Sequence, residues 1–147
     1  MKDFLFPQPT ESKGFSLLLL CLRLLFGILL IIHGFDKVYN YTALCFTFPD
    51  PIGIGREISL LFAIFAEILC SLALIFGALF RLSMLPILAV LIVAFFHIHQ
   101  ASIIQGELAF LYLIVLILMY IAGPGQYSID AKIYKYLHAN DYESYEY

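Results

Sequence analysis

Two ionisable residues, Arg23 and Glu67, stand inside apolar runs that are long enough to cross a membrane. Arg23 interrupts the run GFSLLLLCLRLLFGILLIIHGF at residues 14–35, and Glu67 is the only acid in the middle of any such run. An arginine side chain stays protonated in proteins, and a charge at the centre of hydrocarbon costs at least about 2.5 kcal/mol. Each charge therefore needs a partner, and intramembrane charges commonly line a ligand pocket or a proton path.

The positions of these two charges predict that they pair. At 1.5 Å per residue, Arg23 lies roughly 12 Å and Glu67 roughly 20 Å from the same membrane edge. Helical projection places Gly27 and Gly34 on the Arg23 face and Ser71 on the Glu67 face, and small residues let helices approach closely in lipid. We therefore predict an Arg23–Glu67 pair across a small-residue interface. The pair either only fixes packing or lines a ligand cleft, and both readings stand open.

A second group of polar residues gathers at the opposite edge of the apolar runs. It consists of His33, Asp36, Lys37, His97, His99 and Glu107. Histidines and carboxylates at one level have the chemistry of a metal site, a haem ligand set or a proton relay. There is no HExxH or CxxC spacing. We therefore predict no metal site, disfavour a haem, and favour the plain gathering of polar residues where a span meets water.

His97 and His99 cannot both face the interior of a regular helix, because two residues turn it by about 200°. The side that carries His97 also carries Val90 and Val93, which are smaller than Ile92 and Phe95 on the His99 side. Projection therefore predicts that His97 faces the other helices.

Composition shows which elements must position these residues. The chain has 147 residues, of which 63% are hydrophobic and 13% charged, with a mean hydropathy of +0.94. A soluble domain carries about 25% charged residues, so we predict an integral membrane protein whose partner is the lipid bilayer. The net charge of −3, without a basic stripe, excludes nucleic acid as a partner.

Four apolar segments are each close to the roughly 20 residues that cross a bilayer. They cover residues 15–35, 57–80, 82–100 and 107–123. An open sheet cannot cross lipid. We therefore predict an all-α protein with one domain, residues 15–125, built as an antiparallel bundle of four transmembrane helices.

Charge asymmetry predicts the orientation of this bundle. One side carries five basic residues, Lys2, Lys13, Arg81, Lys132 and Lys135, and the other carries two, Lys37 and Arg56. By the positive-inside rule both termini are expected in the cytoplasm. The cytoplasmic tails would be residues 1–14 and 126–147.

Two segments outside the spans carry structural signals. The outer loop 36–56 contains FPDPIGIG at residues 48–55, which is turn chemistry. Its residues Phe46, Phe48, Ile52 and Ile54 predict that it folds back on the bundle as a structured loop. In the C-terminal tail, Ile129, Ile133, Tyr136 and Leu137 follow helical spacing and predict a short helix on the inner membrane surface.

The chain resembles the DoxX family of small four-helix bacterial membrane proteins. The first matching pattern is R-x3-G-x5-HG-x2-K at Arg23, Gly27, His33, Gly34 and Lys37. It is followed by Glu67 with Gly77 and Arg81, by AFF-x2-H ending at His99, and by GE-x4-YL at Gly106, Glu107, Tyr112 and Leu113. The last is GPG-x2-S-x-D at Gly123, Pro124, Gly125, Ser128 and Asp130. Each motif alone is weak, but the ordered set is specific and covers residues 23–130.

The resemblance implies a multi-pass subunit of the bacterial plasma membrane that is linked to quinone or to thiol and sulfur redox chemistry. The cofactor is left unknown, with quinone as the candidate that the resemblance suggests. The resemblance also favours His99, against projection, as the family histidine, and both histidines stay open. Cys21, Cys45 and Cys70 form no CxxC pair, so a partner protein would supply the redox centre. A non-catalytic anchor or assembly subunit is the alternative, and a small-solute or ion carrier is a weaker one. A homo-oligomer stays open.

Overall fold

The computed structural model describes residues 12–143, with side chains through Leu137, and every element in that range is a helix. Residues 1–11 of the predicted N-terminal tail therefore lie outside it, as do residues 144–147. The prediction of an all-α protein is confirmed for the described residues. Within residues 12–143, three helices are long and apolar enough to cross a membrane.

The first of these helices is α2, Lys13–Tyr39. A short helix, α3, Tyr41–Thr47, follows it. The second long helix combines α4, Arg56–Phe65, with the π-helical segment η1, Ala66–Cys70, and α5, Ser71–Phe76. The third combines α6, Phe80–Val93, with a second π-helical segment, η2, Ala94–Ile98.

The last apolar helix, α7, Glu107–Ala122, has 16 residues, fewer than the three long helices. At 1.5 Å per residue it covers roughly 24 Å, against about 30 Å of hydrocarbon. The structure thus supports three spans by length, and the fourth span stays a prediction. After α7 the chain forms α8, Ile129–Glu143, where the sequence predicts an interfacial helix.

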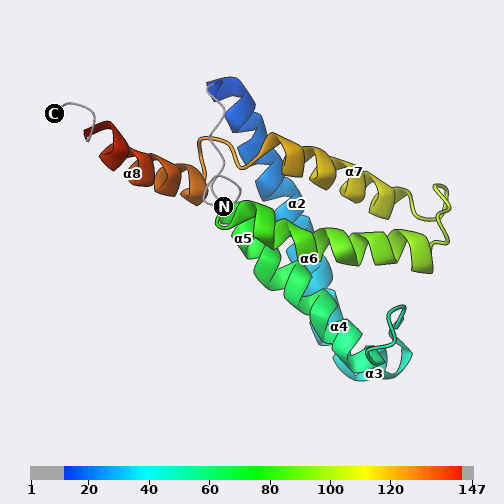
Figure 1. The fold of residues 1–147 in the computed structure, drawn as a ribbon. Coiled ribbons are helices and arrows are strands. Elements are labelled where there is room, and N and C mark those ends of the chain that lie inside the picture. The colour runs from blue at the N-terminus through cyan, green and yellow to red at the C-terminus, as the bar shows by residue number, and fades with distance from the viewer. Residues whose placement is uncertain (1–11, 144–147) are drawn as a thin grey trace.

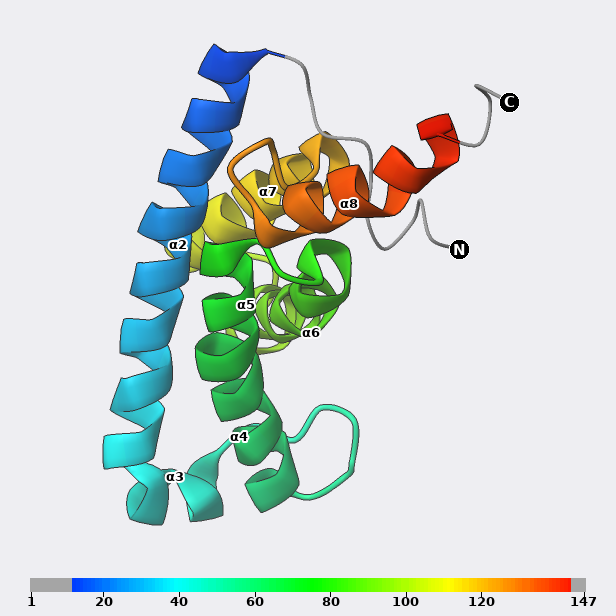
Figure 2. The same cartoon turned by 90° about the vertical axis from the view of Figure 1, so that its left-hand side faces the viewer.

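The helices form two antiparallel pairs that share one core. Figure 2 shows α2 beside α4 and α5, and Figure 1 shows α6 beside α7, while α8 projects away from the bundle. Leu30, Leu74, Phe80, Met84 and Leu116 lie at the centre of the shared core and are almost fully buried. Many leucines and isoleucines on the outside are exposed, as expected for a surface that contacts lipid.

The turn between the second and third long helices differs from the predicted one. The second helix ends at Phe76 rather than residue 80, and the third begins at Phe80 rather than residue 82. Gly77 adopts the left-handed conformation with φ +64°, in which glycine commonly ends a helix. This glycine signal was present in the sequence and outweighs the apolar run that continues past it.

The connection between α3 and α4 is held by local polar contacts. Asp50 accepts hydrogen bonds from the backbone N–H groups of Ile54 at 3.0 Å and Gly55 at 2.8 Å, and from the Ser59 hydroxyl at 3.0 Å. Arg56 donates to the Phe46 carbonyl. Phe46 and Ile52 are themselves 74% and 72% exposed, so the predicted folding back is incomplete for these two side chains.

Candidate functional site

Arg23 is not paired with Glu67, contrary to the prediction from depth. Its Nη1 donates to the Pro124 carbonyl at 2.5 Å and its Nη2 to the Tyr127 carbonyl at 2.6 Å. The depth count failed because the first turns of α2 reach past the end of α5 (Figure 2). Arg23 therefore lies level with the turn after α5 and the segment after α7, rather than beside Glu67.

Gly77 makes room for the Arg23 guanidinium. A Cβ atom at this position would lie 2.6 Å from Arg23 Nη1 and 2.6 Å from Ser128 Cβ. The left-handed backbone at Gly77 is also one that residues with a side chain rarely adopt. Arg23 and Gly77 therefore belong to one contact, although more than fifty residues separate them in the sequence.

The C-terminal motif completes this contact. Asp130 accepts hydrogen bonds from the backbone N–H groups of Leu79 and Phe80, both at 2.8 Å, and so caps the start of α6 from a distant segment. Burial raises the pKa of Asp130 above its usual value, although these two bonds and Arg23 oppose the shift. Ser128 accepts from the N–H of Ala131 at 3.0 Å and thereby caps α8.

We refer to Arg23, Gly77, Asp130 and residues 123–128 as the Arg23 cluster. Gly123, Pro124 and Gly125 are buried within it, and the Arg23 side chain is only 1% exposed. Arg23 Nε has no hydrogen-bond partner among the described residues, whereas both terminal nitrogens bind backbone carbonyls. The cluster joins α2, the start of α6 and the start of α8.

Glu67 has a different partner, Lys37. Lys37 Nζ lies 2.8 Å from Glu67 Oε1 and 2.6 Å from Oε2. Glu67 is buried, with 7% of its surface exposed, whereas the Lys37 side chain is 21% exposed, so only the acid of the pair is removed from solvent. A third, longer contact of 3.5 Å joins Lys37 Nζ to the His33 carbonyl.

Glycines on α2 allow this ion pair to form. A Cβ atom on Gly34 would lie 3.1 Å from Glu67 Cβ, and one on Gly27 would lie 3.4 Å from the Ser71 carbonyl oxygen while overlapping Ile75. The small-residue face of α2 therefore meets η1 and α5. It brings Lys37, rather than Arg23, to the acid.

The ion pair lines a cavity of about 160 Å³. Its other walls come from the α3–α4 connection, from α4 and from α6 with η2. They are Phe48, Pro49, Pro51, Ile52, Ile54, Ser59, Phe62, Ala63, Ala89, Val90, Val93, Ala94 and Ile98. Lys37, Glu67 and Ser59 are the polar side chains among otherwise apolar walls. We call this the Lys37–Glu67 cavity.

Both π-helical segments border this cavity. Glu67 belongs to η1, and Ala94 and Ile98 belong to η2. Such segments often occur at functional sites. Their extra residue per turn changes which side chains face inward, and hydrophobic periodicity gave no signal for them.

The sequence groups the histidines only as polar residues that gather where a span meets water, and the structure places them in different surroundings. His97 is exposed, whereas His99 is half-buried and its Cβ lies 2.7 Å from where a Cβ on Gly106 would be. The projection that favoured His97 was therefore wrong, because His97 lies within the π-helical segment η2 and His99 directly follows it, so the turn per residue here departs from 100°. His33 packs edge-on against Tyr112, with 6.3 Å between ring centroids. Glu107 is exposed, and the described residues contain no group of three potential metal ligands.

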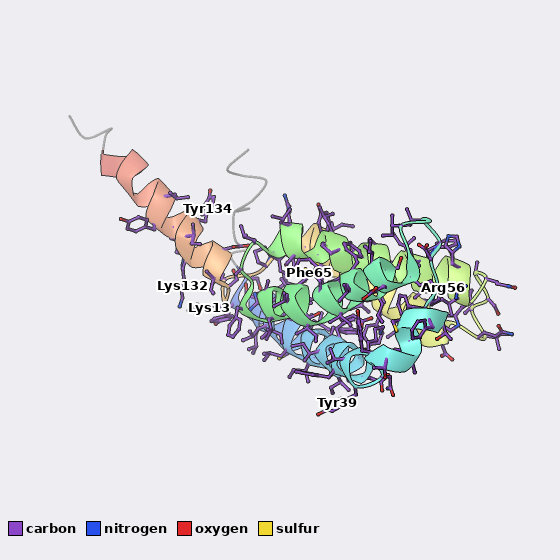
Figure 3. The ribbon with its side chains drawn as sticks, turned by 90° about the horizontal axis from the view of Figure 1, so that it is seen from below. Lys13, Tyr39, Arg56, Phe65, Lys132 and Tyr134 are labelled. Atoms are coloured by element: carbon purple, nitrogen blue, oxygen red, sulfur yellow. The ribbon has the colours of Figure 1, made fainter. Side chains whose placement is uncertain are left out.

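The two clusters occupy opposite ends of the bundle. Figure 3 shows Lys13 and Lys132 at the end where α8 begins, and Arg56 at the end that carries the α3–α4 connection. The Arg23 cluster lies at the first end and the Lys37–Glu67 cavity toward the second. The described basic residues that predict the orientation lie at these two ends. The orientation of the bundle in the membrane stays a prediction.

One family model, DoxX, matches residues 18–100. The match covers more than half of the chain, from α2 through η2, and includes Arg23, Lys37, Glu67 and His99. It ends before α7 and the C-terminal motif. Neither a curated protein nor a solved structure shows significant similarity to the chain.

Proposed function

The chain belongs to the DoxX family, and on that premise we propose that this membrane protein is a subunit of a quinone-linked oxidoreductase of the bacterial plasma membrane. The proposal places the quinone ring in the Lys37–Glu67 cavity. The observation that carries it is an ion pair between a buried Glu67 and a half-buried Lys37 that faces an apolar cavity. A purely structural pair would not need such a space beside it.

The cavity suits a single ring with polar substituents. An apolar cavity of about 150 Å³ in another protein binds benzene, so this one, at about 160 Å³, has room for the six-membered ring itself, and the larger substituents of a quinone would extend through its open side. Ligand sites combine mostly apolar walls with a few placed polar groups. Here the walls are apolar, and Lys37 and Glu67 offer a cationic donor and an anionic acceptor to the carbonyl or hydroxyl oxygens of a ring.

The ion pair has the chemistry that a quinone site requires. A bound quinone supplies a couple of two electrons and two protons. The Lys37 ammonium can donate a hydrogen bond to a ring oxygen, and the Glu67 carboxylate, 2.6 Å from Nζ, can hold or release a proton beside it. A positioned acid and base of this kind are the usual means of moving protons at a reacting oxygen.

A partner protein is part of the proposal. Cys21, Cys45 and Cys70 are free thiols in different environments, exposed, half-buried and buried, and they offer no dithiol pair of their own. We infer that the electrons come from another subunit. Four spans with both termini in the cytoplasm would leave the Lys37–Glu67 cavity near the outer leaflet.

The proposal is tested by quinone binding to the purified full chain in lipid nanodiscs. The probe is the ubiquinone ring without its tail. We expect Lys37→Met to weaken binding about tenfold or more, because a hydrogen bond to a charged group contributes about 1.5–3 kcal/mol. Lys132→Met, an exposed lysine on α8, is the matched control and should bind like the unchanged chain.

The same experiment decides against the proposal if the unchanged chain binds no quinone. A non-catalytic anchor would then be the better account, and a pull-down that returns one stable partner would support it. Melting curves of both lysine variants must be recorded alongside. They show whether a loss of binding merely reflects a loss of folded protein.

A further inference from the structure

A long apolar groove lies beside the Lys37–Glu67 cavity. It has a volume of about 610 Å³ and runs between the second and third long helices. Its exposed rims include Phe65, Leu69 and Leu82, and its deeper wall includes the buried residues Cys70 and Ser83. Bulky rims around smaller deep residues make a shallow, open groove along the helices.

The groove and the cavity share two wall residues, Phe62 and Ala89. From Phe62 on α4 the groove continues along η1 and α5 as far as Ala73, roughly 16 Å at 1.5 Å per residue, and Ala78 and Leu79 in the turn before α6 complete its wall. The helical part alone covers about half of the roughly 30 Å of hydrocarbon in a bilayer. The groove thus leads from the polar cavity along the lipid-facing surface toward the opposite end of the spans.

We propose that the Lys37–Glu67 cavity and this groove together bind an amphiphilic lipid, with its polar ring in the cavity and its isoprenoid tail in the groove. The inference rests on the proposed function and adds the ligand's tail and its route. The ligand enters sideways from the bilayer between Phe62 and Ala89. Membrane-confined quinones are therefore preferred over water-soluble rings or small anions.

The contribution of the tail is expected to be moderate. Lipid tails are as apolar as the groove, so moving the tail from lipid to groove gains little from the hydrophobic effect. What it gains is packing contacts, each of which is small. A bulky side chain placed in the groove should therefore weaken tail binding severalfold and leave ring binding unchanged.

The test compares two ligands with the same ring, the tail-less ubiquinone ring and ubiquinone with its isoprenoid tail. Ala73 lines the groove but not the cavity. We expect Ala73→Phe in nanodiscs to weaken the tailed ligand about fivefold and to leave the tail-less ring unchanged. Ala109→Phe, on α7 and outside both hollows, is the matched control and should change neither.

A second measurement uses the unchanged chain and so does not depend on how the variants fold. Ubiquinone that carries a photoreactive group on its tail is bound, irradiated and mapped by mass spectrometry. Labels on the groove helices, residues 62–86, support the inference, and labels confined to α7 or α8 overturn it. If Ala73→Phe weakens both ligands equally, the proposal that the tail binds in the groove is wrong, whereas the proposal that the ring binds in the cavity is unaffected. If neither ligand binds the unchanged chain, the proposed function itself fails.

Discussion

The molecule buries charge at both ends of its helices, and it does so in two different ways. At one end, both terminal nitrogens of Arg23 donate hydrogen bonds to main-chain carbonyls. The guanidinium packs against Gly77 so closely that even a Cβ atom there would overlap it. At the other, Lys37 and Glu67 satisfy each other and face a cavity. We therefore expect the Arg23 contact, which is satisfied by fixed backbone, to serve the fold, and the Lys37–Glu67 pair, which lies beside free space, to serve a ligand.

Residues that stand in separate motifs of this sequence come together in two contacts. Arg23, Gly77 and the GPG-x2-S-x-D segment are distant in sequence but form one contact. Gly34, Lys37 and Glu67 form the other. We expect substitutions in the first group to reduce stability and substitutions in the second to reduce ligand binding.

The largest expected effect is that of Arg23→Leu. It leaves the carbonyls of Pro124 and Tyr127 without their donor, and each hydrogen bond to a charged group contributes about 1.5–3 kcal/mol. We expect a loss of about 3 kcal/mol or more in the free energy of unfolding. Thermal melting in nanodiscs measures it. Arg23→Lys should recover only part, because an ammonium cannot present the planar fork of a guanidinium.

A smaller loss is expected for Asp130→Asn. The asparagine side chain keeps one acceptor oxygen, so only one of the two backbone N–H groups at the start of α6 stays capped. We expect a loss of about 1–2 kcal/mol in stability and unchanged binding of the ubiquinone ring. If Asp130→Asn folds normally but no longer binds the ring, the Arg23 cluster does not serve stability alone, and the proposed difference between the two ends is contradicted.

The smallest effect concerns Asp50, at the cavity end. Burial tends to raise the pKa of Asp50, but the hydrogen bonds from Gly55, Ser59 and Ile54 together outweigh it and the pKa lies below its usual value. A lowered pKa in the folded state contributes stability that is present above the ordinary aspartate pKa and is lost as the pH falls through the folded value. Melting temperature measured against pH should therefore drop at acidic pH, and Asp50→Asn should remove that part of the dependence. An unchanged pH profile in Asp50→Asn would show that the loop contributes nothing.

Much of the fold followed from the sequence, because apolar length is a strong signal. The segments 15–35, 57–80, 82–100 and 107–123 each overlap one of the observed helices. Boundaries were less accurate, since Gly77 ended the second helix earlier than its hydropathy suggested. The short α7 shows that uniform apolar composition does not by itself guarantee the length of a span.

The site was only half predictable. Projection put Gly34 and Lys37 on one face of α2, and in the structure both meet Glu67, but projection chose the wrong cation. The level of Arg23 relative to the second long helix depends on how far α2 extends past the end of that helix. The sequence of α2 does not contain this information. The π-helical segments likewise change side-chain direction without a hydrophobic signature, which is why His97 was preferred over His99.

Glu67→Gln in nanodiscs shows most directly whether Glu67 serves a ligand site or the fold. Two quantities are measured on this variant, the affinity for the ubiquinone ring and the melting temperature. Glutamine keeps the size of the side chain and an acceptor for Lys37 but loses the charge. We predict that ring binding falls about tenfold or more while the melting temperature stays near that of the unchanged chain. Undiminished binding together with a collapse in melting temperature would contradict the account, because Glu67 would then serve the fold just as Arg23 does.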